Sequence, residues 1–200
     1  MAAYLSHFFG IGIPAVLIFA CFGPYRRRAL LAQNLSSSLW REVALHLFVL
    51  CLFGLAGMIL WPGYHFEPSE GLWGNLVIHS SRKNWQEGIN LVPFRMITNY
   101  LRAFQSRKFT YSIIQFLGNI CTFLPLGFFP ALLFRDFGAR KTFRFGLIFS
   151  LGVEFCQFFL GRHSDVDDVI LNISGVMLGF VIYRMAKRRF PKALERFSLK

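Results

Sequence analysis

Residues 154–172, EFCQFFLGRHSDVDDVILN, place several chemically capable side chains beside long apolar runs. Glu154 and Gln157 lie inside one such run, and their spacing of three puts them on the same face of a helix. Burial destabilises a charged carboxylate, which suits it to proton transfer near neutral pH. One hypothesis is therefore that Glu154 acts as a general base with Gln157 as its orienting partner. Further candidates for the same catalytic site follow at helical spacing: Asp165, Asp168 and Asn172.

The same residues allow other interpretations. Glu154 could instead form an ion pair with Arg162, or join an amide network that holds helices together. Arg162 could bind phosphate or carboxylate as a sixth catalytic-site candidate, or pair with a nearby aspartate at the surface. The acidic residues offer oxygen ligands of the kind that Mg²⁺ and Ca²⁺ prefer. They equally fit the first turn of a helix, where carboxylates are favourable, so we predict no metal site and name no cofactor.

The composition is that of a membrane protein. Hydrophobic residues make up 54% of the 200 residues, Phe alone occurs 25 times, and charged residues account for 16%. Soluble proteins carry about 25% charged residues, so this chain must bury apolar surface in lipid. The net charge of +12 lies in basic blocks beside the apolar runs. Such blocks are typical of orientation signals and lipid contacts, and nucleic-acid binding is not expected.

Five segments approach the 20 or so helical residues that span a bilayer, so we predict an all-α polytopic bundle. The predicted spans are Tyr4–Phe22, Val43–Trp61, Tyr111–Phe134, Phe145–Leu160 and Val166–Tyr183. The connections and tail on one side of them carry fifteen of the 22 lysines and arginines, and the other side carries seven. The richer side should be cytoplasmic. The prediction is a cell-membrane protein with its N-terminus outside and its C-terminus inside.

This orientation brings polar residues of three spans to one level. Glu154, Asn172 and Asn119 would each lie in the outer third of the membrane, while the inner halves of these spans carry no charge. Charged and polar groups are costly there, so we expect an outward-opening polar pocket, with Asn119 binding substrate. Glycines were expected to let neighbouring helices approach closely: Gly118, Gly127, Gly175 and Gly179.

The predicted organisation has four parts: two spans in 1–62, an extracellular loop in 63–110, a three-helix core in 111–183, and a basic tail in 184–200. Residues 95–108 of the loop have an amphipathic pattern that favours a helix in the headgroup plane. The loop motif NLVPF could fold over the pocket, with Asn90 and Phe94 contacting substrate, or simply lie at the interface. The four cysteines show neither a metal-binding nor a disulfide pattern.

Three motifs, NLVPF (90–94), GNICTFLPLGF (118–128) and SLGVEFCQFFLGRHSDVDDVILNISGVMLG (150–179), resemble the VanZ-like family in order and spacing. The resemblance covers about residues 85–183. It implies a bacterial multi-pass membrane protein with a role at the cell envelope, since the member that names the family is associated with teicoplanin resistance. It does not imply a reaction. The positions that it carries over include every candidate named above, with Asp167 able to replace Asp165 as the acidic member.

The functional prediction is that the pocket binds or acts on a lipid-linked envelope component. The alternative is a non-catalytic protein that alters access to the cell surface or the assembly of the envelope. Whether the protein is an enzyme stays open. The predicted partners are the lipid bilayer and a lipid-linked precursor or polymer, and the oligomeric state is not predicted.

Overall fold

A computed structural model describes the backbone of residues 2–60, 64–67, 75–78, 89–90, 93–94, 98, 109–159 and 164–199. Within these ranges the side chains of 2–5, 59–60, 64–67, 75–78, 89–90, 109–115 and 164–165 are not described. The predicted amphipathic segment 95–108 thus falls almost wholly outside the described residues, as do Arg162 and His163.

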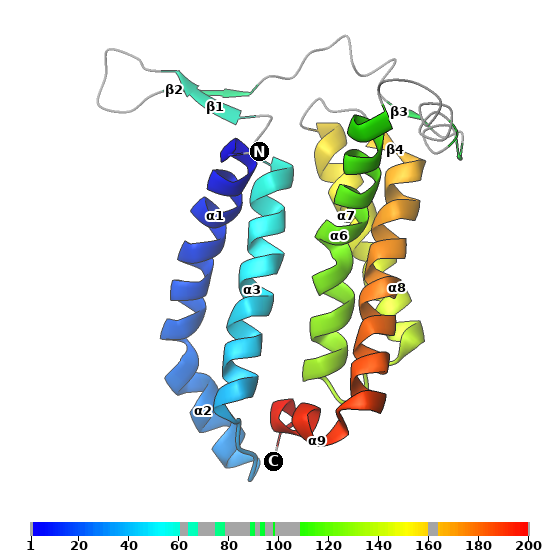
Figure 1. The fold of residues 1–200 in the computed structure, drawn as a ribbon. Helices are drawn as coiled ribbons and strands as arrows, with labels where there is room; N and C mark the ends of the chain where they lie inside the picture. Colours follow the sequence, from blue (N-terminus) through cyan, green and yellow to red (C-terminus); the bar gives the residue numbers. More distant parts are fainter. Residues whose placement is uncertain are drawn as a thin grey trace.

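Long helices dominate the fold, as predicted (Figure 1). They are α1 (Ala2–Cys21), α2 (Gly23–Ala32), α3 (Leu39–Leu60), α6 (Phe109–Leu133), α7 (Ala139–Phe159) and α8 (Val166–Arg189), followed by the short α9 (Pro191–Leu194) and the 3-10 turn η2 (Glu195–Phe197). Two small strand pairs accompany them. β1 (Tyr64–Glu67) pairs antiparallel with β2 (Asn75–Ile78), and β3 (Ile89–Asn90) pairs parallel with β4 (Ser164–Asp165).

The helices have the length and surface of membrane spans. Four of them, α3, α6, α7 and α8, contain windows apolar enough to cross a bilayer, and the bent pair α1–α2 would make five. Their outer surfaces expose large apolar side chains such as Leu17, Ile148 and Phe155, each more than 60% accessible. A water-soluble bundle would bury such residues, whereas lipid accommodates them.

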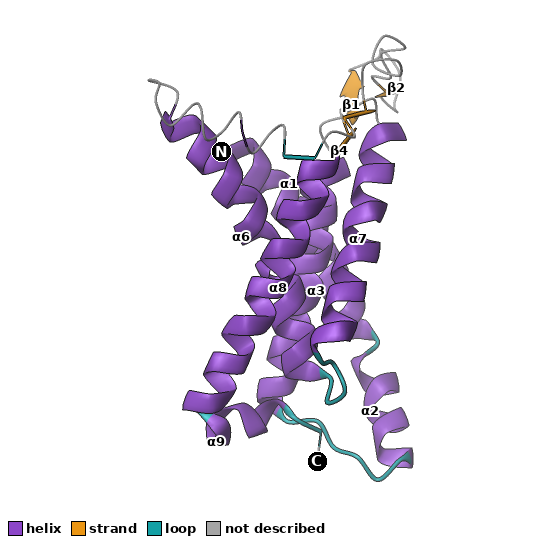
Figure 2. Cartoon of the chain, turned by 90° about the vertical axis from the view of Figure 1, so that its right-hand side faces the viewer, coloured by secondary structure: helices purple, strands orange, loops and turns teal. Residues whose placement is uncertain are grey.

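The two ends of the bundle differ, and Figure 2 shows them from the side. The strands and the N-terminus lie at one end, which we call the strand end. At the opposite end, here the basic end, lie α2, α9 and the C-terminus, together with the arginines of α2 and the last turn of α8. The two termini therefore lie at opposite ends, as an odd number of spans requires.

Helix α8 is central to the second half of the fold, because α6 and α7 both pack against it and contact each other little. Its backbone approaches that of α6 very closely. A Cβ built on Gly127 would overlap the carbonyl oxygen of Val176, and one on Gly175 or Gly179 would overlap a carbonyl oxygen of α6. Three of the four glycines thus have the predicted role. The prediction for Gly118 was wrong, since a Cβ there meets no described atom within 4 Å.

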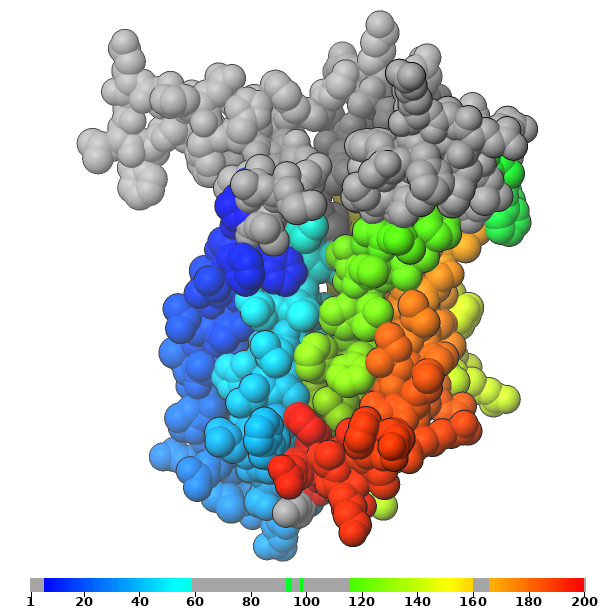
Figure 3. All heavy atoms as spheres, in the orientation of Figure 1, coloured from blue at the N-terminus to red at the C-terminus, as the bar shows by residue number. Residues whose placement is uncertain are grey.

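The apolar core joins this three-helix unit to the pair formed by α1 and α3. One buried cluster groups Leu55 of α3 with Phe123 and Leu126 of α6 and with Val153 and Val176. A second cluster, at the basic end, includes Ala44, Leu45 and Leu133, and the half-buried Phe197 of the C-terminal segment packs against it. The C-terminal segment therefore packs against the bundle at its basic end (Figure 3).

The helix boundaries depart from the predicted spans where charged residues begin the helix. We expected the second span to start at Val43, with Arg41 in the connecting segment, but α3 begins at Leu39 and Arg41 is only 6% exposed. Likewise α7 begins at Ala139 and includes Arg140, Lys141 and Arg144, so it is six residues longer at this end than the predicted span. A span predicted from hydropathy ends where charged residues begin, whereas the helical backbone continues through them.

Candidate functional site

The site begins with a stripe of small and polar residues along α7. Thr142, Gly146, Ser150 and Glu154 recur every four residues, and all four are buried. This spacing puts them on one helical face. That face packs against α8, because a Cβ on Gly146 would lie 3.0 Å from a methyl group of Val176. The absence of bulky side chains along the stripe explains why the two helices can approach there.

A hydrogen bond fixes the register of these two antiparallel helices one turn further along. The side-chain amide of Asn172 in α8 donates to the hydroxyl of Ser150 in α7 over 3.1 Å, and both residues are almost fully buried. Each further turn along α7 corresponds to one turn back along α8. The next pair in this register after Gly146 with Val176 and Ser150 with Asn172 is Glu154 with Asp168.

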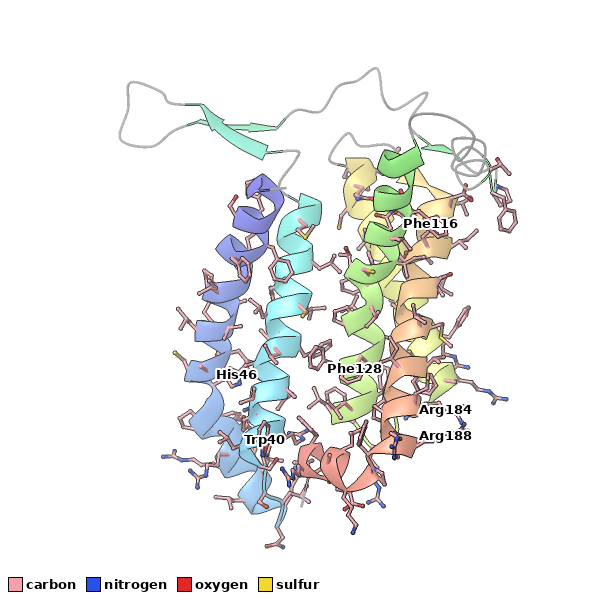
Figure 4. The ribbon with its side chains drawn as sticks, in the orientation of Figure 1. Trp40, His46, Phe116, Phe128, Arg184 and Arg188 are labelled. Atoms are coloured by element: carbon pink, nitrogen blue, oxygen red, sulfur yellow. The ribbon has the colours of Figure 1, made fainter. Side chains whose placement is uncertain are left out.

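Helix α6 contributes to the same level. The side-chain amide of Asn119 donates to the carboxylate of Asp168 over 3.0 Å. Asn119 follows Phe116 by about one turn, and Figure 4 labels Phe116 near the strand end of α6. Asp168 therefore contacts α6 directly and faces the level of Glu154 on α7. We call Asn119, Ser150, Glu154, Asp168 and Asn172 the polar layer.

Asn90 and Phe94 of the motif NLVPF contact residues at or just before the start of α8, at the strand end and next to this layer. Asn90 pairs with Asp165 in the short parallel ladder of β3 and β4. The backbone N–H of Phe94 donates a hydrogen bond to the carboxylate of Asp167, which is completely buried. Two segments more than 70 residues apart in the sequence thus meet at the strand end. The loop motif therefore contacts the start of α8, while a role of Asn90 and Phe94 in substrate contact stays a prediction.

Phe94 has an unusual conformation for such a residue. Its φ angle of 66° lies in the left-handed region, which a bulky L-residue adopts only at a cost of about 1–3 kcal/mol. Its ring is exposed. The hydrogen bond to Asp167 helps to hold this strained turn with the aromatic ring at the surface of the strand end.

Other predicted residues are placed less closely. Asp165 lies in β4, outside α8, so it does not continue the helical face of Asp168 and Asn172 as we predicted. Asp167, the substitute that the sequence allowed, lies within α8 and is buried. Gln157 is half-buried in the last turn of α7, three residues beyond Glu154. Among the residues whose side chains the structure describes, no three acidic, histidine or cysteine side chains form a metal-binding group.

Sequence reasoning missed Ser150. A serine inside an apolar run carries no signal of its own, and the predicted stripe on α7 included only Glu154 and Gln157. The signal was present in the spacing, because Ser150 precedes Glu154 by four residues. Such spacing identifies a polar face only when the facing helix is known to present Asn172.

The polar layer combines groups that can bind or transform a polar ligand. Two carboxylates at one level can share a proton or hold a cationic group between them. The amides of Asn119 and Asn172 fix the orientation of the neighbouring side chains and provide both donors and acceptors. A layer of this kind inside an apolar bundle is costly, and intramembrane acids usually mark functional sites.

Comparisons with known proteins agree with the motifs. The model of the VanZ/LLP1 family matches residues 48–187, a stretch that begins before NLVPF and ends in the last turn of α8. The chain is also 29% identical over 113 residues to "Protein VanZ" of Enterococcus faecium, which is 56% of this chain and 62% of that protein. The match therefore spans less than two thirds of the relative's length. No solved structure matches.

Proposed function

Because this chain belongs to the VanZ/LLP1 family of membrane proteins, we propose that its polar layer receives the head group of a lipid-linked component of the bacterial cell envelope. The family resemblance connects such proteins with resistance to teicoplanin-type glycopeptides. We extend that connection to this chain as part of the same proposal. The strand end would then face the cell exterior, and the basic end the cytoplasm.

The observation that carries the proposal is the convergence of three helices on the polar layer, which covers two neighbouring turns of α7 and α8. Asn119 of α6 binds Asp168 of α8, and Asn172 of α8 binds Ser150 of α7, next to the buried Glu154. By the rise of a helix, Glu154 and Asn172 lie about 8–9 Å from the ends of α7 and α8 at the strand end, and Asp168 lies about 3 Å from the start of α8. A ligand anchored in the bilayer by acyl chains could present its head group at this depth.

In the catalytic version, Glu154 is the general base and Asp168 positions the polar group that loses the proton. Arg162 and Asp165 would assist from the connection between α7 and α8, and Asn90 and Phe94 from the loop. In the non-catalytic version the same groups only bind. The two versions differ in their tolerance of isosteric change, because an amide keeps the size and one acceptor oxygen of a carboxylate but cannot act as the base.

The test is complementation in cells that lack the chain. We expect wild-type protein to lower teicoplanin susceptibility, and Glu154→Gln and Asp168→Asn each to lose this effect at equal protein abundance. Phe155→Leu is the matched control, since Phe155 follows Glu154 but exposes its ring on the lipid-facing surface. Full protection by both isosteric variants would exclude the catalytic version. Mass spectrometry of lipid extracts from the same strains would identify the envelope component that changes.

Loss of protection on Glu154→Leu together with Asp168→Leu would retain the binding version, provided that both variants accumulate normally. If these apolar variants also protect fully, the polar layer has no part in the function and the proposal fails. Unchanged susceptibility and lipid extracts with and without wild-type protein would remove the connection with glycopeptides itself.

A further inference from the structure

A second cluster of costly polar groups lies at the basic end, on elements that the proposed function does not use. Helix α1 bends by 45° at Phe22 into α2, and a tight connection then leads back into α3. Between these elements lies a cavity of about 710 Å³, lined by Arg26, Arg27 and Arg28 from α2 and by Glu42 from α3. These residues precede the stretch from 48 to 187 that matches the family.

Arg26 is held in a fixed position within this cavity. Its guanidinium forms a salt bridge with Glu42 and lies 4.6 Å from the centre of the Phe19 ring. One of its terminal nitrogens, Nη1, is nevertheless buried with no hydrogen-bond partner among the described residues. The hydroxyl of Ser37, which lines the same cavity, is also buried without a partner. A pre-positioned guanidinium N–H and a hydroxyl are the donors that a phosphate oxygen accepts.

The charge of this cluster is not balanced by the groups around it. Arg41, one residue before Glu42, is almost completely buried and close enough to Arg26 for their charges to repel. Its Nε has no hydrogen-bond partner. Among the described residues, the half-buried Arg26 and the buried Arg41 thus have one glutamate beside them, which leaves one positive charge uncompensated. Such a charge strongly destabilises an apolar region unless an anion balances it.

The shape and lining of the cavity favour a lipid over a small ion. The cavity volume is about 710 Å³, whereas one water molecule occupies about 30 Å³. The cavity is therefore several times larger than a single phosphate group. Leucines line the rest of the cavity, and two of them, Leu31 and Leu39, also expose most of their surface. The basic side chains and the leucines together match the phosphate and the upper acyl chains of a phospholipid.

We propose that the cavity between α2 and α3 is a binding site for an anionic phospholipid from the leaflet at the basic end. The phosphate accepts hydrogen bonds from Arg26 Nη1 and Ser37, and Arg27 adds long-range attraction. The lipid phosphate adds a negative charge beside Arg26, which reduces the excess of positive charge at Arg26 and Arg41. The lipid also occupies the space between α2 and the start of α3, beside the bend.

The site can be tested by native mass spectrometry of the full chain in detergent, titrated with phosphatidylglycerol and, separately, with phosphatidylcholine. We expect the wild-type protein to bind one phosphatidylglycerol. The Kd should be about tenfold higher for Arg26→Gln, because this variant loses a charged hydrogen bond. Ser37→Ala and Arg27→Gln should each weaken binding by about threefold. These two variants remove side chains without hydrogen-bond partners in the structure, so they keep the test decisive if Arg26→Gln does not fold.

The matched control is Arg140→Gln, which removes an exposed arginine at the same end but outside the cavity. It should bind like wild type. Equal weakening by Arg140→Gln would mean diffuse attraction to the whole basic end, and unchanged binding by Ser37→Ala and Arg27→Gln would exclude the site. Displacement of phosphatidylglycerol by excess inorganic phosphate would identify a soluble anion as the occupant and overturn the lipid assignment, as would equally tight binding of phosphatidylcholine. None of these measurements depends on the polar layer or on resistance.

Discussion

The side-chain amide of Asn172 donates a hydrogen bond to the hydroxyl of Ser150, which joins α8 to α7 in the interior of the bundle. The bond is buried, so water cannot replace either partner if the other is removed. It also fixes which residues of the two helices face each other, and Glu154 and Asp168 come to one level as a result. The polar layer therefore depends on this contact for its geometry.

Replacing Ser150 by alanine should destabilise the protein by about 1–3 kcal/mol, because the amide of Asn172 would be left buried without its acceptor. Thermal unfolding in detergent measures the change. Ser174→Ala is the control, since the Ser174 hydroxyl is exposed and binds only a carbonyl of its own helix. If Ser150→Ala lowers the unfolding temperature no more than Ser174→Ala does, the buried hydrogen bond contributes nothing to stability.

Replacing Gly179 by alanine should separate α6 from α8. The added methyl group would overlap the carbonyl oxygen of Leu124, and overpacking of this kind costs about 1–3 kcal/mol. The control is Gly152→Ala on α7, where a Cβ meets no described atom within 4 Å and helix propensity favours alanine by up to about 1 kcal/mol. The two variants should shift the unfolding temperature in opposite directions. Equal behaviour would contradict the close backbone contact.

Replacing Asp167 by alanine should release the turn at Phe94. The Phe94 amide would lose its carboxylate acceptor, and a bond to a charged group contributes about 1.5–3 kcal/mol, so its hydrogen exchange should accelerate at least about tenfold. Asp167→Asn keeps an oxygen acceptor and should have a smaller effect. Asp136→Ala, an exposed acid at the opposite end, should leave this amide unchanged. Protection that survives Asp167→Ala would mean that other contacts hold the turn.

The predicted orientation can be tested by labelling in intact cells. In a chain whose four native cysteines are replaced by serine, a cysteine at Pro93 should react with a membrane-impermeant maleimide from outside. A cysteine at Ser198 should react only after the membrane is permeabilised. Both positions are exposed, at the strand end and the basic end respectively. If the cysteine at Ser198 reacts from outside and the one at Pro93 only after permeabilisation, the orientation is the reverse of the predicted one. The polar layer would then lie toward the cytoplasm.

Much of the helical framework could be predicted from the sequence, because apolar runs of span length have few alternatives in a membrane. The predicted ends were least accurate at Arg41 and Ala139, where helices continue through charged residues that hydropathy assigns to connections. The glycine argument identified Gly127, Gly175 and Gly179 but failed for Gly118. All four lie in apolar runs, and only the neighbouring helix decides which face is crowded.

The candidate site was predictable only in part. Glu154, Asp168, Asn119 and Asn172 could be identified because acids and amides are unexpected inside apolar runs. Ser150 could not, since a serine in such a run gives no comparable signal. Two contacts join distant segments: the backbone pairing of Asn90 with Asp165, and the hydrogen bond from the Phe94 backbone to the Asp167 side chain. Such contacts depend on tertiary geometry, which periodicity along one segment does not contain.

The close approach of α6 and α8 limits how this protein can move. The backbones of these helices are in contact at Gly127, Gly175 and Gly179, so the helices have little freedom to slide or rotate past each other. We therefore expect α6 and α8 to move together as one rigid body. Any opening that admits a ligand to the level of Glu154 must then come from α7, from the α1–α3 pair, or from the segments above them. A crosslink between α6 and α8 would leave such an opening intact, whereas one between α7 and α8 would block only an opening that comes from α7.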